Sequence, residues 1–318
     1  MRGAALRIVE DLWAPEPPER DSVITFGKFD ALHLGHQSIF DEVVRQARAV
    51  SADATVFFLH PHPMKLLDPA RCPASLTSLP NKLRLLESFG VDVAIVGRFD
   101  ERLRATAADA FVRHLVERFR AGSLVVGHSV RFGFRGAGDV ALLQRMAPEI
   151  GFDVTTMPAQ LVEGEPISST RIRIAISAGD LSLAHRLLGR RYSVVGRVVP
   201  GEKRGRSLGF PTANVDAGDQ QLPPLGIYAG ETTVNGVAYA SAISLGVRPT
   251  FRDTGVWLES YLLDFEGDLY GEEVEVGFGE KLRDEERFDT LDALKRQIRD
   301  DVAAVRRSTM QENRTQAS

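Results

Sequence analysis

Cysteine is almost absent from this sequence, because Cys72 is the only one in 318 residues. A single cysteine excludes an internal disulfide and a metal site built from several cysteines, and it is typical of a reducing compartment. Long apolar runs are absent too, since no window approaches the ~20 residues that a membrane-spanning helix needs. Glu10 and Asp11 interrupt any secretory apolar segment near the start. We therefore expect a cytoplasmic protein with no membrane partner.

The sequence also lacks a strong excess of charge of either sign, with a net charge of −4 at pH 7. Proteins that bind nucleic acid through bulk electrostatics carry a basic surface, so we expect no nucleic-acid partner. Apolar residues make up 43% and charged residues 26% of the chain, as in ordinary globular proteins. The length suffices for about two domains.

Strand-like and helix-like segments alternate in the first half. Apolar residues recur at helical spacing between Ile39 and Ala47, and again between Phe111 and Phe119, where Thr106 and Asp109 suggest a capping box. Such alternation indicates a parallel α/β sheet that is covered on both faces. The predicted strands are residues 22–27, 54–60, 92–99 and 122–128.

The second half changes character, because its strand-like segments follow one another without helices between them. Turn signals such as Asn-Gly at 235–236 separate them, which favours an antiparallel barrel or sandwich with one closing helix after it. The strands are predicted at 192–199, 226–234, 237–245, 256–265 and 273–278. We expect domains at 1–184 and 185–308, followed by a polar, frayed tail at 309–318.

Two histidines stand close together in "FGKFDALHLGHQ", where a predicted strand ends and a helix begins. Ligands of open α/β sheets bind at the carboxyl ends of strands, and a helix N-terminus attracts phosphate. His33 and His36 would add donors for a charged polyphosphate. Two alternatives stay open at this point: an ordinary helix start with incidental histidines, and a metal hydrolase that also uses His60 and His62.

Two further segments carry hydroxyl, glycine or basic residues in patterns suited to phosphate. "ISSTRIR" at 167–173 combines helix-capping hydroxyls with guanidinium groups, although an ordinary capped helix has the same pattern. "GEKRGRSLGFPTANV" at 201–215 follows a strand and contains glycines and basic residues, a weak signal that many solvated turns share.

The order and spacing of these segments resemble bacterial bifunctional riboflavin kinase/FAD synthetases over the chain from about residue 22 onward. The motifs that carry the resemblance are "GKFDALHLGHQ", "HPHP", "KLRLLESFGVD", "VVGHSVRFGFRGAGD", "ISSTRIR" and "GFPTAN", with "DFEGDLYG" and "KLRDEERF" after them. The resemblance implies a Rossmann-like nucleotidyltransferase α/β domain followed by an antiparallel β-barrel riboflavin kinase domain with a C-terminal helix. It also implies ATP as co-substrate, riboflavin and FMN as substrates, and FMN and FAD as products.

For the N-terminal domain the resemblance implies adenylylation of FMN to FAD with release of pyrophosphate. His33 and His36 would be catalytic, and Ser129 and Phe132 would bind flavin, as Arg283 would in the C-terminal domain. The implied ATP-binding residues are Gly27, Phe29, Asp30, His33, His36, Ser168, Ser169, Thr170 and Arg173.

For the C-terminal domain the resemblance implies phosphorylation of riboflavin. Glu259 would be the catalytic base, and Thr212 and Asn214 would hold Mg²⁺, a hard cation that prefers oxygen ligands. Strand parity places Glu259 and Tyr261 on one face and Leu258 on the other. The implied ATP-binding residues of this domain are Gly205, Gly209, Pro211, Thr212 and Asn214.

The sequence departs from the family's pattern at Ala31, His60, Ser129 and Val130, and at Lys28, where relatives commonly have asparagine. These departures motivate one alternative, a riboflavin kinase whose adenylyltransferase half is weakened or specific for a flavin analogue. A flavin-binding regulatory protein with little catalysis is another, against which Glu259, Thr212 and Asn214 argue. The sequence leaves room for weak self-association.

Overall fold

The computed structural model describes residues 5–13, 19–201, 209–247 and 255–316. The chain forms two compact units. The first unit comprises Met1–Pro73 and Leu79–Ser168, and the second comprises Ala74–Ser78 and Ser169–Ser318. Helices α7 (Ser169–Ala178) and α8 (Leu181–Leu188) thus belong to the second unit. The predicted division at 184/185 stays a proposal for the limits of the two functional domains.

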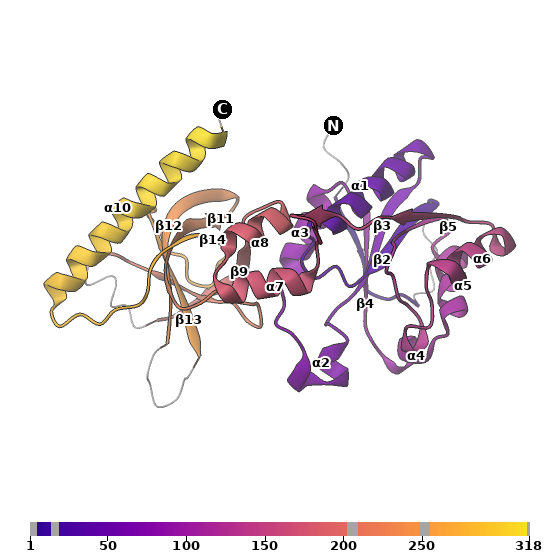
Figure 1. Ribbon diagram of the computed structural model, residues 1–318, viewed down its shortest axis with the longest axis horizontal. Helices are drawn as coiled ribbons and strands as arrows, with labels where there is room; N and C mark the ends of the chain where they lie inside the picture. Colours follow the sequence, from indigo (N-terminus) through magenta and orange to yellow (C-terminus); the bar gives the residue numbers. More distant parts are fainter. Residues whose placement is uncertain (1–4, 14–18, 202–208, 248–254, 317–318) are drawn as a thin grey trace. The chain divides into compact units, whose positions relative to one another are not determined.

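The first unit is built on a parallel sheet, as the alternating pattern predicted (Figure 1). Its strand order is β1-β4-β3-β2-β5-β6, and every neighbouring pair runs parallel. The sequence did not predict β1 or β6, because neither has the long apolar run of a buried central strand. The strands are β1 (Arg7–Val9), β2 (Ser22–Gly27), β3 (Asp53–Leu59), β4 (Val93–Gly97), β5 (Ala121–Gly127) and β6 (Asp153–Met157).

Helices cover both faces of this sheet, because successive side chains of its central strands point to opposite sides. Phe58 packs with Phe40 of α1 and with α3, whereas its neighbour Phe57 packs with Phe111 of α5. The helices are α1 (Leu34–Ala49), α3 (Leu79–Ser88), α5 (Ala108–Arg118) and α6 (Val140–Ile150). Shorter elements are α2 (Met64–Leu67), η1 (Pro69–Arg71), α4 (Glu101–Ala105), η2 (Phe134–Gly136) and the hairpin of β7 (Leu161–Val162) and β8 (Glu165–Pro166).

The predicted capping box at the start of α5 is wrong. Ala107 occupies the N-cap position and makes no side-chain cap. The hydroxyl of Thr106 instead donates to the carbonyl of Arg102, 2.6 Å away, at the end of α4. The short preceding helix thus takes the hydroxyl that the sequence pattern assigned to α5.

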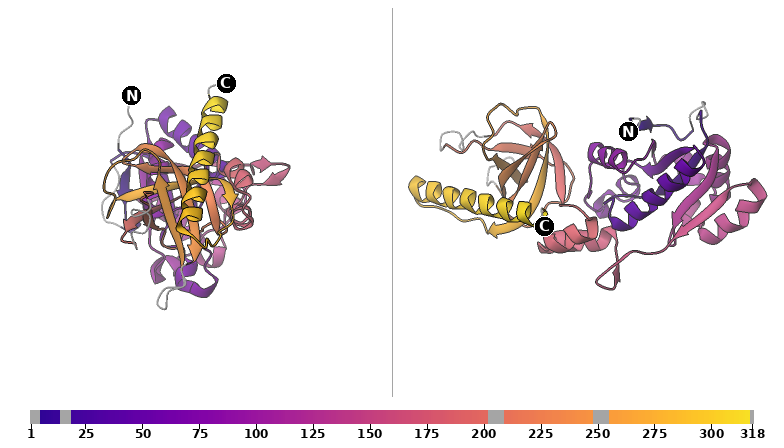
Figure 2. Two further views of the ribbon diagram at one scale, coloured as in Figure 1. Left: turned by 90° about the vertical axis from the view of Figure 1, so that its left-hand side faces the viewer. Right: turned by 90° about the horizontal axis from the view of Figure 1, so that it is seen from above.

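The second unit contains a closed antiparallel barrel with the order β10-β13-β12-β11-β14-β9, as predicted (Figure 2). Tyr228, Ile243 and Phe278 are fully buried in it. The sequence missed β10, which has only four residues. The strands are β9 (Ser193–Val199), β10 (Ala213–Asp216), β11 (Gly226–Val234), β12 (Val237–Val247), β13 (Val256–Leu262) and β14 (Glu273–Arg283).

One long helix, α10 (Leu291–Gln316), lies beside the barrel (Figure 2). Its Val302 and Val305 pack with Ala229 and Leu263 in a small apolar cluster. The helix continues to Gln316. The prediction of a frayed tail from residue 309 is therefore wrong for residues 309–316. Helix propagation is easier than initiation, and the turns already packed on the barrel extend into the polar sequence.

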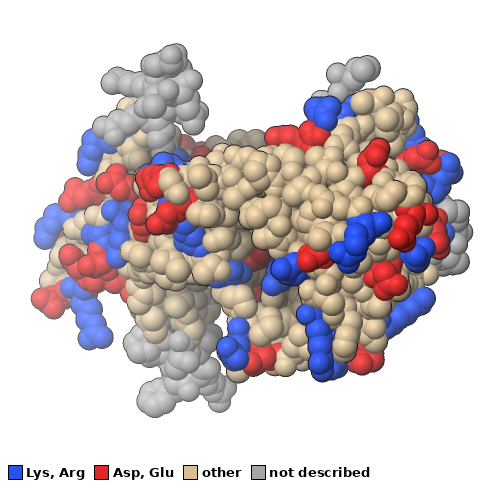
Figure 3. All heavy atoms as spheres, turned by 45° about the vertical axis from the view of Figure 1, so that its right-hand side comes forward, with Lys and Arg blue, Asp and Glu red and all other residues tan. Residues whose placement is uncertain are grey.

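Charges of both signs are intermingled over the face seen in Figure 3, without a large area of one sign. Within the described ranges, no helix is long and apolar enough to cross a membrane.

Candidate functional site

The turn between β2 and α1 carries the histidine pair at the carboxyl edge of the parallel sheet. His33 is the N-cap residue of α1, and its Nδ1 accepts a hydrogen bond from the His36 backbone N–H at 3.3 Å. In a neutral ring this bond makes Nδ1 the acceptor and places the proton on Nε2. The pair therefore lies at a helix N-terminus, where backbone N–H groups favour an anion.

The two imidazole rings stack on each other. Their centroids are 3.6 Å apart with an angle of 18° between the planes, and His33 is only 6% exposed. A Cβ at Gly35 would lie 3.2 Å from the His33 ring, so the glycine makes room for this stacking.

The same turn has a strained backbone held by apolar anchors. Phe29 and Leu32 adopt positive φ angles of 40° and 44°, a region that residues with side chains seldom occupy. Their side chains are 3% and 0% exposed in the core under the sheet edge. Ala31 is fully buried between them, and Asp30 is half-buried. The surrounding core therefore fixes the position of the histidines.

His62 uses one ring nitrogen locally, because its Nδ1 accepts the backbone N–H of Met64 at 3.1 Å. In the parts of the chain that the structure describes, no three His, Cys, Asp or Glu side chains gather where they could hold a metal ion.

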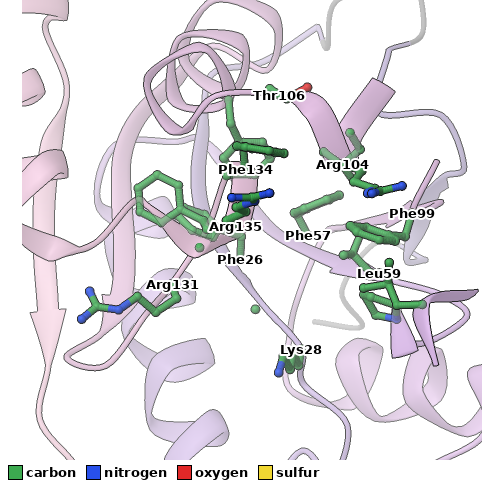
Figure 4. A pocket seen from close by; sticks show the side chains of 18 of the residues that line it. Phe26, Lys28, Phe57, Leu59, Phe99, Arg104, Thr106, Arg131, Phe134 and Arg135 are labelled. Atoms are coloured by element: carbon green, nitrogen blue, oxygen red, sulfur yellow. The ribbon is translucent and has the colours of Figure 1, made fainter. Parts of the chain in front are cut away.

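A pocket of about 500 Å³ opens at the same edge of the sheet in the first unit. Its walls come from the ends of β2 and β3, from Phe99 after β4, and from α4 and η2. Figure 4 shows the rings of Phe57, Phe99 and Phe134 around one space. Ligand pockets of this size and aromatic content hold drug-sized planar molecules.

Basic side chains from separate segments line the same pocket. They are Lys28, Arg104, Arg131 and Arg135, and none of the described lining residues is Asp or Glu (Figure 4). An aromatic cavity with cationic groups suits a planar ligand that carries an anionic group.

Two predicted flavin-binding residues of this unit differ in their relation to the pocket. Phe132 is 7% exposed and lines it. Ser129 is exposed and is not among the residues that line it. The departure from the family pattern at Ser129 therefore leaves the pocket wall unchanged.

The hydroxyl-and-arginine segment begins helix α7. Ser168 and Ser169 are half-buried, Thr170 is exposed, and the Nε of Arg173 donates to the carbonyl of Ala74 at 3.0 Å. Ser169, Thr170 and Arg173 belong to the second unit, whereas the histidine pair belongs to the first. Their joint contact with ATP stays a prediction.

In the barrel, neighbouring strands bring the predicted kinase residues together. Asn214 of β10 is directly opposite Glu259 of β13, and side chains at such paired positions lie on the same face. The hydroxyl of Thr212 donates to Glu259 Oε2 at 3.1 Å. The structure thus places a carboxylate, a hydroxyl and an amide side by side.

The parity expected for β13 agrees with the exposure of its residues. Leu258, Ser260 and Leu262 are buried, whereas Glu259 and Tyr261 are partly exposed. Glu259 therefore points away from the barrel interior. In that direction a substrate hydroxyl could reach it.

Asn214 is 5% exposed and packs on the backbone at Gly201. A Cβ at Gly201 would lie 2.2 Å from Asn214 Nδ2, so only glycine leaves the amide in its place. Gly209 is exposed with a φ of +87°, and Pro211 is exposed too. Gly205 and the basic residues of this loop lie outside the described residues.

Arg283, which the sequence also predicted to bind flavin, engages the terminal helix. Its Nε and Nη2 donate to the two carboxylate oxygens of Asp301 at 3.0 and 2.8 Å, and its Nη1 donates to the Asp284 carbonyl. The hydrogen bonds to Asp301 raise the pKa of Arg283 above its ordinary value. Binding of flavin by Arg283 stays a prediction.

The sequence interpretation missed most residues of the aromatic and basic pocket. Arg131 and Arg135 stand within a motif that was recognised, but Phe57, Phe99 and Arg104 come from segments with no motif of their own. Their common signal is position, because each lies at or just after the carboxyl end of a strand or in the helix that follows.

Known proteins resemble the chain along both units. A family model described as FAD synthetase matches residues 16–171, and one described as riboflavin kinase matches residues 188–309. A bifunctional riboflavin kinase/FMN adenylyltransferase of Escherichia coli strain K12 is 39% identical over 297 residues, which cover 91% of this chain and 93% of that protein. The enzyme of the same description from Pseudomonas fluorescens is 38% identical and covers 95% and 97%.

A solved structure from Streptococcus pneumoniae, described as a macrolide-efflux protein, has a TM-score of 0.84 at 28% sequence identity. The match covers 95% of this chain and 99% of that one. This likeness shows that the two proteins share their folds.

Proposed function

The chain belongs to the family of bifunctional riboflavin kinases/FMN adenylyltransferases, and we propose how its residues divide the two reactions. The protein phosphorylates riboflavin to FMN with ATP and then joins FMN to AMP, which releases pyrophosphate. The C-terminal domain performs the first reaction and the N-terminal domain performs the second.

The observation that carries the kinase proposal is the hydrogen bond from Thr212 to Glu259, with Asn214 directly opposite Glu259 on the paired strand. Glu259 accepts the proton of the riboflavin 5′-hydroxyl as that oxygen attacks the γ-phosphorus of ATP. Thr212 donates its one proton to Glu259, so the lone pairs of its oxygen point elsewhere. Glu259 thereby orients the Thr212 oxygen as well as the attacking hydroxyl.

A hard cation fits this set of donors. The hydroxyl oxygen of Thr212 and the amide oxygen of Asn214 are the ligands that Mg²⁺ accepts together with nucleotide phosphates. When bound, Mg²⁺ neutralises charge on the phosphates during transfer. Gly201 keeps Asn214 in place for this role, because any side chain there would displace the amide.

For adenylyl transfer we assign the phosphates of ATP to the turn of His33 and His36. The N-terminus of α1 and the donors of the stacked rings support this assignment, since both favour charge that develops on pyrophosphate. Gly27, Phe29 and Asp30 belong to the same turn. The proposed contribution of Ser168, Ser169, Thr170 and Arg173 rests on the resemblance.

We assign the pocket between β2, β3 and η2 to FMN. Its phenylalanine rings suit the apolar faces of the isoalloxazine, and its basic residues suit the phosphate, which the kinase product carries and riboflavin lacks. Lys28 is exposed at the start of the histidine turn and lines this pocket. It thus lies where it could bring the FMN phosphate to the α-phosphorus of ATP.

Two reciprocal variants test this division in the full-length chain. With riboflavin, ATP and Mg²⁺, we expect Glu259→Gln to form neither FMN nor FAD, yet to form FAD when FMN is supplied. We expect His36→Ala to accumulate FMN without FAD. Products are resolved by chromatography, and each variant is the folding control for the other. Full FMN formation by Glu259→Gln would remove the base assignment.

We propose that the enzyme works in the cytoplasm without a nucleic-acid or membrane partner. This proposal rests on the single cysteine, which is typical of a reducing compartment, and on the small net charge of −4. Weak self-association stays open to a sedimentation measurement.

A further inference from the structure

Helix α3 carries a buried lysine on the side that packs against the core. Leu79, Leu83 and Leu86 of this helix join the apolar cluster of Phe29 and Leu32. Lys82 lies on the same side at helical spacing and is only 4% exposed. Lysine is almost never fully buried in proteins unless its charge is paired.

The buried charge opposes folding rather than favouring it. Burial lowers the pKa of Lys82 to about 8, and the charge of Asp30 acts in the opposite direction without restoring the usual value. A lowered lysine pKa means that the charged form is disfavoured in the folded protein. Methionine or leucine would fill this position without that cost, so stability gives no reason for an amine here.

The amine lies over a ring of the strand that pairs with the start of the histidine turn. Its Nζ is 4.7 Å from the ring centroid of Phe58, and Phe58 is paired in the sheet with Gly27, where the turn begins. The strained residues Phe29 and Leu32 belong to the same cluster as Phe58. Asp30 stands between those two anchors, and it is the residue whose charge acts on Lys82.

We propose that Lys82 is a positioning residue for adenylyl transfer: its buried ammonium group holds Asp30, and with it the turn of His33 and His36, in the conformation that receives the ATP phosphates. The proposal rests on the assignment of that turn to adenylyl transfer. It gives a role to the segment "KLRLLESFGVD", which no catalytic assignment has used.

The apolar anchors fix the place of the turn, and a charged group adds an interaction that depends on direction. Hydrophobic contacts are non-directional, so Phe29 and Leu32 fix where the turn lies but do not themselves orient the Asp30 carboxylate. The ammonium group of Lys82 supplies that direction. A small displacement of a catalytic group is enough to slow a reaction that depends on positioning.

The first test compares Lys82→Met, which removes the charge, with Lys82→Arg, which keeps it. Leu83→Met on the same helix is the matched packing control. For Lys82→Met we expect kcat of FAD formation to fall at least ~10-fold with an unchanged KM for FMN, because other residues line the FMN pocket. Lys82→Arg should recover part of the loss. Riboflavin phosphorylation by the same preparations should stay at the wild-type rate.

Thermal unfolding separates this role from a structural one. Lys82→Met should melt at the wild-type temperature or above, since it removes a disfavoured charge, whereas a packing defect would lower the melting temperature. The proposal would be overturned if Lys82→Met formed FAD slowly and had a lower melting temperature, and if Leu83→Met showed similar losses of both. FAD formation by Lys82→Met at the full rate would also overturn it.

The pairing with Asp30 has a readout that does not depend on catalysis. In the wild-type background, Lys82→Met removes the cost of the buried charge but also removes its favourable attraction to Asp30. In an Asp30→Asn background the attraction is already absent, so Lys82→Met removes only the cost. The gain in melting temperature should therefore be larger in the Asp30→Asn background. Equal gains would overturn the pairing, whatever the FAD assay shows. Normal FAD formation by His36→Ala would instead refute the assignment of the turn.

Discussion

The bond between Arg283 and Asp301 predicts how strongly α10 is held to the barrel. The two side chains are only 17% and 8% exposed, and two parallel N–H···O bonds join them. Gln297 donates a third hydrogen bond to Asp301 Oδ1 at 3.0 Å. Asp301→Asn keeps the shape of this side chain but removes its charge, and it turns an N–H group toward a donor.

The magnitude follows from burial. Solvent screens this pair little, because most of both side chains is out of water. Removal of one partner from a buried ion pair leaves an uncompensated charge and destabilises proteins by about 3–5 kcal/mol. The asparagine oxygen still accepts one of the two bonds, so we expect a loss of about 3 kcal/mol from the second unit.

Tryptophan fluorescence can report this unit alone. The chain has two tryptophans, Trp13 in the first unit and Trp257 in β13. In a Trp13→Phe background the signal comes from the barrel, and urea unfolding then gives the stability of the second unit. Measuring one unit avoids treating a two-unit chain as a single transition.

An exposed pair on the same helix supplies the control. Arg306 donates two hydrogen bonds to Asp264, at 2.8 and 2.6 Å, which are no longer than those between Arg283 and Asp301. The side chains of Arg306 and Asp264 are, however, 49% and 70% exposed. Asp264→Asn should change the stability far less, since solvent screens surface pairs. Equal losses from Asp264→Asn and Asp301→Asn would refute the argument from burial.

Three further predictions concern the two active sites and the stability of the first unit. Gly201→Ala would place a Cβ 2.2 Å from Asn214 Nδ2, so riboflavin phosphorylation should fall at least ~10-fold in a steady-state assay while FAD formation from supplied FMN is unchanged. Lys28→Gln should raise KM for FMN about tenfold, because one hydrogen bond to a charged group is lost. An unchanged KM would show that Lys28 does not bind the FMN phosphate. Lys82 has a pKa of about 8 in the folded protein and a higher one when unfolded, so the unfolded chain binds more protons above pH 8. Stability of the first unit should therefore rise between pH 8 and ~10.5 by up to ~3 kcal/mol relative to Lys82→Met, measured from Trp13 fluorescence in a Trp257→Phe background.

Local patterns predicted most elements that have a strong period of their own. The strands at 22–27 and 226–234 match the structure at both ends, because a buried apolar run and its turn residues occur together there. Weakly apolar or very short strands such as β1, β6 and β10 escaped prediction. Their partners across the sheet stabilise them, and one segment of sequence does not contain that information.

The candidate sites divide in the same way. A single turn carries His33, Gly35 and His36, so their spacing at a helix start, taken together with the segment at 167–173, predicts a phosphate site. The pocket takes Phe57, Phe99 and Phe134 from segments far apart, and only the parallel sheet brings the ends of their strands together.

What the sequence by itself determined about this protein is the order of its two folds, its family, and the short motifs of both reactions, since these depend on residues close together in the chain. Only the tertiary structure decided that Glu259 lies beside Asn214 and Thr212, because strand register sets that pairing. It also decided that Lys82 is buried over the ring of Phe58 and that Arg283 holds Asp301. The burial of a charge depends on what the rest of the chain packs around it.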